Sequence, residues 1–209
     1  MITESVREKL ICFEKLNFKL RGFNMSGYKP IAGKGFRKSV TWKESLARAG
    51  YAPLISRCPT GEQITNGGFE TGDTTDWTVT GTIEVVTYKA HSGSYSARTL
   101  RNKTGTVAQT LSTSVPTVCI VDTSTFGLYI LSDWSWSPEG GGIFTAKINY
   151  TDGTSTTVTR EITEAEENAW QYWDLKPYLE ADKEIESIKI TLEGNVGTLP
   201  YVDDISLIP

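Results

Sequence analysis

Short runs of β-forming residues, separated by turn residues, occupy the chain from residue 61 onward and limit what it can fold into. The runs are 78–80, 82–88, 94–100, 106–112, 126–134, 143–150, 154–162, 170–175, 185–192 and 201–208. Gly, Ser, Asn or Pro interrupts them, which is typical of an antiparallel sandwich. About ten strands without a long internal helix predict an all-β, two-sheet jelly roll over residues 61–209.

The clearest local signal is a hairpin centred on Asp152-Gly153. Residues 143–150 and 154–162 flank this pair with strand-like patterns. Asp-Gly is a preferred pair for a tight primed turn. The sequence therefore predicts that these two runs pair in an antiparallel hairpin.

Charge is segregated at about residue 60. Residues 1–60 hold twelve Lys and Arg against four Glu and no Asp, a net charge of +8. The remaining nine cations and twenty-one carboxylates give residues 61–209 a net charge of −12, within a total of −4. Such asymmetry suggests different surroundings for the two parts. We place the boundary near Pro59-Thr60-Gly61, between a basic N-terminal arm and the sandwich.

The arm is predicted to contain one or two short helices. Ser5-Val6-Arg7-Glu8 and Thr41-Trp42-Lys43-Glu44 both fit the capping box that begins a helix. Between them, residues 19–38 mix Gly with Lys and Arg, which is typical of an extended basic segment.

Targeting signals and cysteine spacing exclude several classes. Charged residues interrupt the first 25 positions, so we expect no Sec signal peptide, and no window reaches the ~18 apolar residues of a membrane span. Cys12, Cys58 and Cys119 show no Cys-x-x-Cys spacing, and His91 is the only histidine, which argues against a zinc cluster. Free thiols are favoured over a Cys12–Cys58 disulfide.

Catalytic patterns are weak, and we predict that the chain is not an enzyme. A Ser-His-Asp device would have to use His91, which sits in a Ser-Gly turn. The acidic run at residues 164–167 is typical of a solvated loop rather than a glycosidase acid/base pair. Gly140-Gly141-Gly142 lacks the Lys-Ser/Thr that grips phosphate.

Three motifs in order carry a resemblance to a known family. They are Asn66-Gly67-Gly68-Phe69-Glu70 followed by Trp77, then His91-Ser92-Gly93-Ser94-Tyr95, and finally Tyr201-Val202-Asp203-Asp204-Ile205. Together they resemble the opening, early and closing strands of carbohydrate-binding modules with the galactose-binding-like jelly-roll fold. The resemblance covers residues 61–209 and leaves the first 60 residues unassigned.

The resemblance implies one structural Ca²⁺ between the first and last strands. Its ligands would be the Glu70 side chain, the Gly68 carbonyl, the Asp203 side chain and groups at Ser92 and Tyr95. Hard oxygen ligands from separate strands suit Ca²⁺. Ser92 stands where the family can carry an acid, which reduces the ligand charge. The alternative is that Glu70 and Asp203 cap strand ends and bind only backbone amides.

Aromatic side chains are the candidates for sugar binding, because sugar rings stack their C–H faces on aromatic rings. The candidates are Trp134, Trp136, Tyr150, Trp170 and Tyr172. Alternation along residues 170–173 puts Trp170 and Tyr172 on one face and Trp173 on the other. For each tryptophan a place in the core remains an alternative, and Trp77 is assigned to the core.

The arm admits three roles: contact with nucleic acid, docking on an acidic protein surface, or a solubilising tail. The acidic sandwich of a neighbouring copy is an electrostatic complement, so self-assembly is favoured over nucleic acid.

We therefore predict a non-enzymatic structural or attachment protein of a multi-subunit assembly, a phage or archaeal virus capsid, tail or fibre component. Residues 1–60 would bind further copies or other virion subunits, and the sandwich would bind a glycan. The alternative is a carbohydrate-binding module of a secreted polysaccharide-degrading enzyme. Either way, the expected location is virion or extracellular, with no membrane partner.

Overall fold

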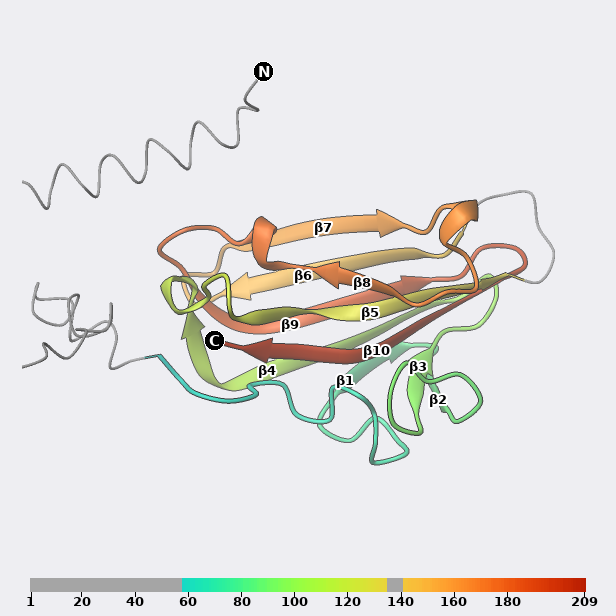
Figure 1. The fold of residues 1–209 in the computed structure, drawn as a ribbon, viewed down its shortest axis with the longest axis horizontal. Coiled ribbons are helices and arrows are strands. Elements are labelled where there is room, and N and C mark those ends of the chain that lie inside the picture. Colours follow the sequence, from blue (N-terminus) through green and yellow to red (C-terminus); the bar gives the residue numbers. More distant parts are fainter. Residues whose placement is uncertain (1–57, 135–140) are drawn as a thin grey trace, which may run out of the picture. The chain divides into compact units, whose positions relative to one another are not determined.

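Residues 58–134 and 141–209 are described by the computed structural model, and they are built from β-strands and single 3₁₀ turns (Figure 1). The strands are β1 (Thr78–Gly81), β2 (Glu84–Val86), β3 (Ser96–Arg98), β4 (Thr104–Pro116), β5 (Thr125–Trp134), β6 (Ile143–Tyr150), β7 (Ser155–Glu161), β8 (Gln171–Asp174), β9 (Glu184–Glu193) and β10 (Thr198–Ile208). The turns are η2 (Thr117–Cys119), η3 (Glu164–Glu166) and η4 (Lys176–Tyr178). Each predicted run overlaps one of these strands, so the all-β prediction is confirmed.

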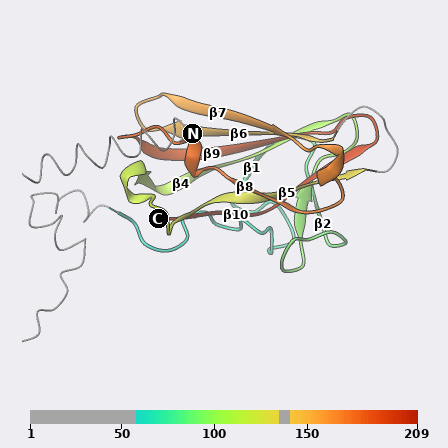
Figure 2. The same cartoon turned by 45° about the horizontal axis from the view of Figure 1, so that its top comes forward.

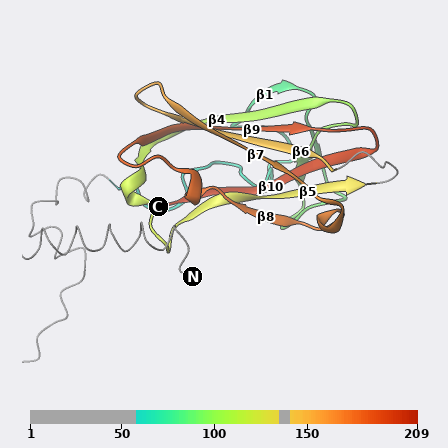
Figure 3. The same cartoon turned by 90° about the horizontal axis from the view of Figure 1, so that it is seen from above.

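The strands form two antiparallel five-stranded sheets. Sheet 1 has the order β1-β4-β9-β6-β7, and sheet 2 has the order β2-β3-β10-β5-β8. Figures 2 and 3 show the two sheets as separate layers, with β4, β9, β6 and β7 in one and β10, β5 and β8 in the other. The predicted two-sheet sandwich is confirmed.

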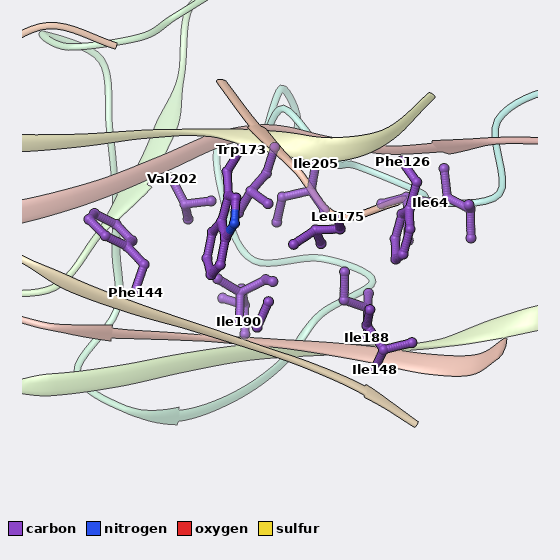
Figure 4. Packing of buried hydrophobic residues seen from close by; sticks show 14 of the residues in the cluster. Ile64, Phe126, Phe144, Ile148, Trp173, Leu175, Ile188, Ile190, Val202 and Ile205 are labelled. Carbon is purple, nitrogen blue, oxygen red and sulfur yellow. The ribbon is translucent and has the colours of Figure 1, made fainter. Parts of the chain in front are cut away.

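The core lies between the sheets and follows from strand alternation. In β5 every second side chain, including Leu128 and Ile130, is fully buried. Figure 4 shows Trp173 and Val202 pointing from sheet 2 toward Phe144 and Ile190 of sheet 1. Burying a side chain of this size contributes about 1.5–3 kcal/mol relative to leaving it in water. The inner faces of the central strands therefore stabilise the sandwich, and their outer faces are free for other roles.

The opening motif lies against the closing strand, as the resemblance implied. The Ile205 N–H donates to the Gly67 carbonyl at 3.0 Å. A Cβ on Gly67 would lie 1.9 Å from the Ile205 carbonyl oxygen, so this contact requires glycine. Trp77 is 7% exposed and packs 5.8 Å from the Phe69 ring, which confirms its place in the core.

The hairpin between β6 and β7 forms where Asp152-Gly153 predicts it, but with a different turn. Tyr150 accepts the Gly153 N–H and donates its own N–H to the Thr154 carbonyl, both at 3.0 Å. Gly153 has φ 83°, whereas Asp152 is not among the residues with positive φ. Both kinds of primed turn need positive φ at the first central residue, which is Asp152 here, so the predicted tight turn is wrong and a wider loop with one left-handed glycine replaces it.

Cys58 and Cys119 form a disulfide across 61 residues of sequence, so the prediction of free thiols is wrong for this pair. Spacing along the chain could not reveal the bond, because Cys58 and Cys119 meet only in the folded protein, where Cys119 lies in η2 after β4. The alternative Cys12–Cys58 pairing is also wrong, since Cys58 already has a partner. Cys12 lies outside the described residues.

The helices predicted in the arm, and most of the proposed arm itself, also lie outside the described residues. Within the described part of the chain, no helix has the length and apolar character needed to cross a membrane.

Candidate functional site

The outer side of sheet 2 carries a group of aromatic rings. Tyr129 of β5 and Tyr172 of β8 are register partners, and their ring centroids lie 5.2 Å apart. Their sequence neighbours Leu128 and Trp173 point the other way into the core. Figure 1 shows β8 beside β5 and β5 beside β10, so rings from all three strands can share one surface.

His91 folds onto this surface from the segment between β2 and β3. Its ring stacks on Tyr129 with centroids 3.4 Å apart and an interplanar angle of 14°, and it meets the edge of Trp170 at 5.8 Å. The Nδ1 atom lies 2.6 Å from Asp204 Oδ2. His91 thus covers one face of Tyr129, while the Tyr172 side chain remains 42% exposed.

Asp204 reaches His91 because β10 carries a bulge. The register with β5 shifts between Asp203 and Ser206, and Asp204 has φ 47°. Such a bulge re-aims side chains, and Asp tolerates left-handed backbone better than most residues. The bulge also lets Asp204 accept a hydrogen bond from the Ser92 hydroxyl at 2.8 Å. His91 and Ser92 thus both hold the segment between β2 and β3 against Asp204.

A second, smaller apolar cluster extends the aromatic surface along sheet 2. Leu131, Val86 and Tyr201 are buried there, with Trp170 and Leu199 partly buried against them. Burial is the main cause that raises the pKa of Tyr201 to about 12, because it disfavours the charged phenolate. This cluster supports the rings from below.

Arg98 lies between the buried ring of Tyr201 and the exposed ring of Tyr88. Its guanidinium lies 5.2 Å from the Tyr88 ring centroid and 6.0 Å from that of Tyr201. The same guanidinium donates to Glu84 Oε2 at 2.9 and 3.1 Å, which fixes its plane. Tyr88 is 63% exposed. We call Tyr88, His91, Tyr129, Trp170, Tyr172 and Tyr201 together the aromatic face.

Charged groups lie among these rings. Lys89 Nζ is 2.9 Å from Asp133 Oδ2 and 5.9 Å from the Tyr201 ring centroid. Their side chains are 28% and 29% exposed, so both remain accessible to a ligand. Rings with accessible donors and acceptors beside them are what a sugar requires, since the rings stack and the polar groups bind hydroxyls.

A cavity of about 360 Å³ lies elsewhere, beside η2 and η4. Its lining is aliphatic and charged, with Val118, Ile120 and Leu179 beside Lys176 and Glu180. None of its lining residues is aromatic, so it offers no ring for sugar stacking, and the aromatic face is the better candidate site.

The predicted sugar-binding residues have different fates. Trp170 and Tyr172 belong to the aromatic face. Trp134 ends β5 opposite Thr198, and nothing further is described of its side chain. Trp136 lies outside the described residues.

Tyr150 was wrongly chosen as a sugar-binding candidate. It is 1% exposed, because alternation along β6 places it on the inner side with Phe144 and Ile148. Its hydroxyl lies 3.1 Å from Thr156 Oγ1 and accepts the Glu180 N–H at 3.1 Å. Counting positions from Phe144 could have assigned it to the core.

Sequence reasoning missed Tyr88, His91 and Tyr129. Tyr129 had a usable signal, since it alternates with Leu128 and Ile130 in a strand with a buried face. His91 and Tyr88 had none, because their partners Asp204 and Arg98 meet them only after the strands pair.

The predicted calcium ligands do gather between the opening and closing motifs. Glu70 Oε1 accepts the N–H groups of Ser94 at 2.9 Å and Tyr95 at 3.0 Å. Asp203 Oδ2 accepts the His91 N–H at 2.7 Å and the Ser92 N–H at 3.4 Å. Both carboxylates therefore bind backbone amides, as the alternative without a metal expects.

The side chains at this place do not form a conventional metal cluster. Among residues 58–134 and 141–209, no group of three or more His, Cys, Asp or Glu is arranged to hold a metal ion. The predicted set relies on two carboxylates and on carbonyls such as that of Gly68, so this finding does not test it. A Cβ on Gly68 would lie 3.7 Å from Asp203 Oδ1, so the Gly68 backbone is close to this carboxylate. Calcium binding stays a prediction.

Asp203 is the most perturbed carboxyl at this place. The side chain is fully buried, and this burial raises its pKa to about 6, while the N–H groups of His91, Asp204 and Ser92 act in the opposite direction. A buried carboxylate that already accepts amides is costly to ionise and gains from any added positive charge.

Comparison with known proteins establishes the fold. No protein-family model matches the sequence, and no curated protein is detectably similar to it. A solved structure of the module TmCBM61 in complex with β-1,4-galactotriose is 22% identical with a TM-score of 0.53, over 71% of this chain and 99% of that one. A family 16 carbohydrate-binding module is 14% identical, with a TM-score of 0.49 over 70% of this chain and 99% of its own. The enzymatically active domain of bacteriophage CBA120 tailspike protein 4 is 12% identical, with a TM-score of 0.42 over 68% of this chain and 21% of its own. The last two likenesses are too weak to carry an argument. The first shows that the sandwich has the fold of carbohydrate-binding modules.

Proposed function

We propose that the sandwich binds a polysaccharide without cleaving it, through the aromatic face. The observation that carries this proposal is the gathering of rings from β5, β8 and the segment between β2 and β3 on the outer side of sheet 2, with Tyr172 and Tyr88 exposed and Tyr201 of β10 buried beneath them. Exposure of large apolar rings to water is unfavourable, and a group of exposed rings therefore marks a ligand-binding surface. The fold shared with a galactotriose-binding module supports the same conclusion.

Tyr172 is the first residue to test. Replacing it with Ala removes the exposed ring that leans on Tyr129, and a lost stacking contact of about 1–1.5 kcal/mol weakens binding about tenfold. We expect this loss on whichever of β-1,4-galactan, xylan and mixed β-glucan binds the wild type, measured by titration calorimetry. Tyr88→Ala should weaken binding in the same direction.

Tyr178 provides the matched control. It is 43% exposed, nearly as much as Tyr172, but it belongs to η4 and not to the aromatic face. Tyr178→Ala should bind like the wild type, and both variants should keep the wild-type melting temperature within about a degree or two. Equal affinity of the Tyr172 and Tyr178 variants would overturn the assignment of the site.

We further propose that residues 1–60 attach this sandwich to a larger assembly, as in a virion component, or to the other parts of a secreted enzyme. The opposite charges of the two parts support docking on other subunits. The disulfide Cys58–Cys119 supports a location outside the cytosol, where such bonds persist.

Light scattering on the full chain and on residues 58–209 tests the assembly role. Association of the full chain that is lost in the shorter chain, and weakened by 1 M salt, is the expected result, because the Debye length falls to about 3 Å. A full chain that stays monomeric at high concentration and low salt would contradict the assembly role while leaving the sugar site unaffected.

A further inference from the structure

Two lysines stand side by side on the outer face of sheet 1. Lys147 of β6 and Lys189 of β9 are direct register partners, and both are exposed. Like charges directly opposite on neighbouring strands destabilise a sheet. In the described part of the chain neither lysine forms an ion pair, whereas Lys89, Arg98, Arg160 and Lys183 all do.

The lysine pair is unusual in this surrounding because the sandwich is strongly acidic. Residues 61–209 carry a net charge of −12, yet no carboxylate of the described residues forms an ion pair with either lysine. The carboxylate nearest to them along β9 is that of Glu186, an exposed residue at the register shift, three residues from Lys189. Glu193 and Glu161 both lie in the row of Ile143, four residues along the strand from Lys147. Four residues in a strand span about 13 Å. The pair is therefore a local concentration of positive charge without an internal partner.

Hydroxyl and amide side chains border the pair on both sides. One row runs in register across all five strands of sheet 1, through Thr80, Thr106, Thr191, Thr145 and Thr159. Its hydroxyls pair at 3.1 Å between Thr106 and Thr191 and between Thr145 and Thr159. On the other side lie Thr110, Ser187, Asn149 and Ser155, with Asn149 donating to Ser187 at 2.9 Å. Five neighbouring strands span about 19 Å, the length of a few sugar units.

We propose that this face binds a polysaccharide that carries carboxylate groups, with one acidic group held between Lys147 and Lys189. Charge complementarity selects an anion, and the flanking hydroxyl rows match the hydroxyls of a sugar chain on either side of it. Nucleic acid is disfavoured, because the rows around the pair hold no aromatic ring for base stacking. The site lies on the opposite sheet from the aromatic face and does not depend on it. It extends the ligand class to acidic glycans.

The test uses the full chain and a short ligand, trigalacturonate, in an amide-resolved NMR titration at low salt. Site resolution matters because residues 1–60 are basic and can bind an anion themselves. Saturable shifts are expected at Thr145, Lys147, Lys189 and Thr191. Each lost charge contact at an exposed site is worth about 0.2–1 kcal/mol, so Lys147→Gln and Lys189→Gln should each weaken binding about 1.4- to fivefold, and together about two- to thirtyfold.

Lys103→Gln is the matched control, because it removes one exposed cation, at the residue just before β4, and leaves the lysine pair unchanged. It should keep the wild-type affinity, and so should Tyr172→Ala, whose loss of galactan binding would concern only the aromatic face. Shifts confined to the arm, or equal affinity of the double variant and the wild type, would overturn the proposal.

Three further ligands define the chemistry. Neutral galactotriose should cause no shift at the lysine pair, and a sulfated trisaccharide distinguishes general anion binding from carboxylate recognition. Triglutamate and trithymidylate should bind the pair at least about tenfold more weakly than trigalacturonate. Equal or tighter binding of any of these ligands at the pair would overturn the assignment to carboxylated sugars.

Discussion

The two outer sides of the sandwich are built by the same strand alternation and yet differ in chemistry. Sheet 2 presents rings whose neighbouring charges are already paired, such as Lys89 with Asp133. Sheet 1 presents rows of hydroxyls around two lysines that form no ion pair with any described residue, and the outer positions of its described strands carry no aromatic ring. The inner sides of both sheets are similarly apolar. The residues that face the core therefore determine the fold, whereas the residues at the outer positions make one surface suited to ring stacking and the other positively charged.

The sharpest way to break this comparison is to truncate two neighbours on β8. Trp173 is 4% exposed in the core, and Tyr172 points to the aromatic face. Trp173→Ala should lower the free energy of unfolding by about 3–5 kcal/mol, as is typical for a buried aromatic side chain. Tyr172→Ala should lower it by less than about 1 kcal/mol. Urea unfolding checks both, and a large loss in the Tyr172 variant would make the aromatic face part of the core.

Calcium is the next largest expected effect, and it acts on the sheet 2 side only. If Ca²⁺ binds at Glu70 and Asp203, an ion concentration 100 times the Kd should stabilise the fold by about 2.7 kcal/mol through linkage. Melting of metal-free protein with and without millimolar Ca²⁺ measures this gain, and Glu70→Gln should reduce it. An identical melting temperature in Ca²⁺ and in chelator would leave both carboxylates as caps for backbone amides.

A smaller effect separates the two outer sides directly. His91→Ala removes the ring stacked on Tyr129 and the contact with Asp204, and should cost about 1 kcal/mol. Thr191→Val removes one hydroxyl pair from sheet 1, and should change stability by no more than about 0.5 kcal/mol because Val suits a strand equally well. Chemical denaturation of both variants tests the ranking. A costlier Thr191→Val would mean that the hydroxyl rows hold sheet 1 together.

Local sequence pattern predicted the strands well because alternation and turn residues act over a few positions. It placed Trp173 opposite Trp170 and Tyr172, and the same rule applied from Phe144 would have placed Tyr150 in the core. It could not predict which residues meet across the sheet. The contact of His91 with Asp204 joins positions 113 residues apart and depends on a bulge in β10. The pairing of Lys147 with Lys189 likewise depends on β6 and β9 being neighbours, which no local signal contains.

The Cys58–Cys119 bond also decides how mechanical load would pass through the protein. A pull applied through the N-terminal part reaches Cys58 and crosses the bond directly to η2, just before β5. The 61-residue separation, about 200 Å of extended chain, is bypassed, so β1 to β4 cannot be drawn out while the bond is intact. A sandwich that is bound to a surface and pulled through its N-terminal part would therefore resist unfolding from the N-terminal side. Under reducing conditions the same pull would act first on residues 58–77.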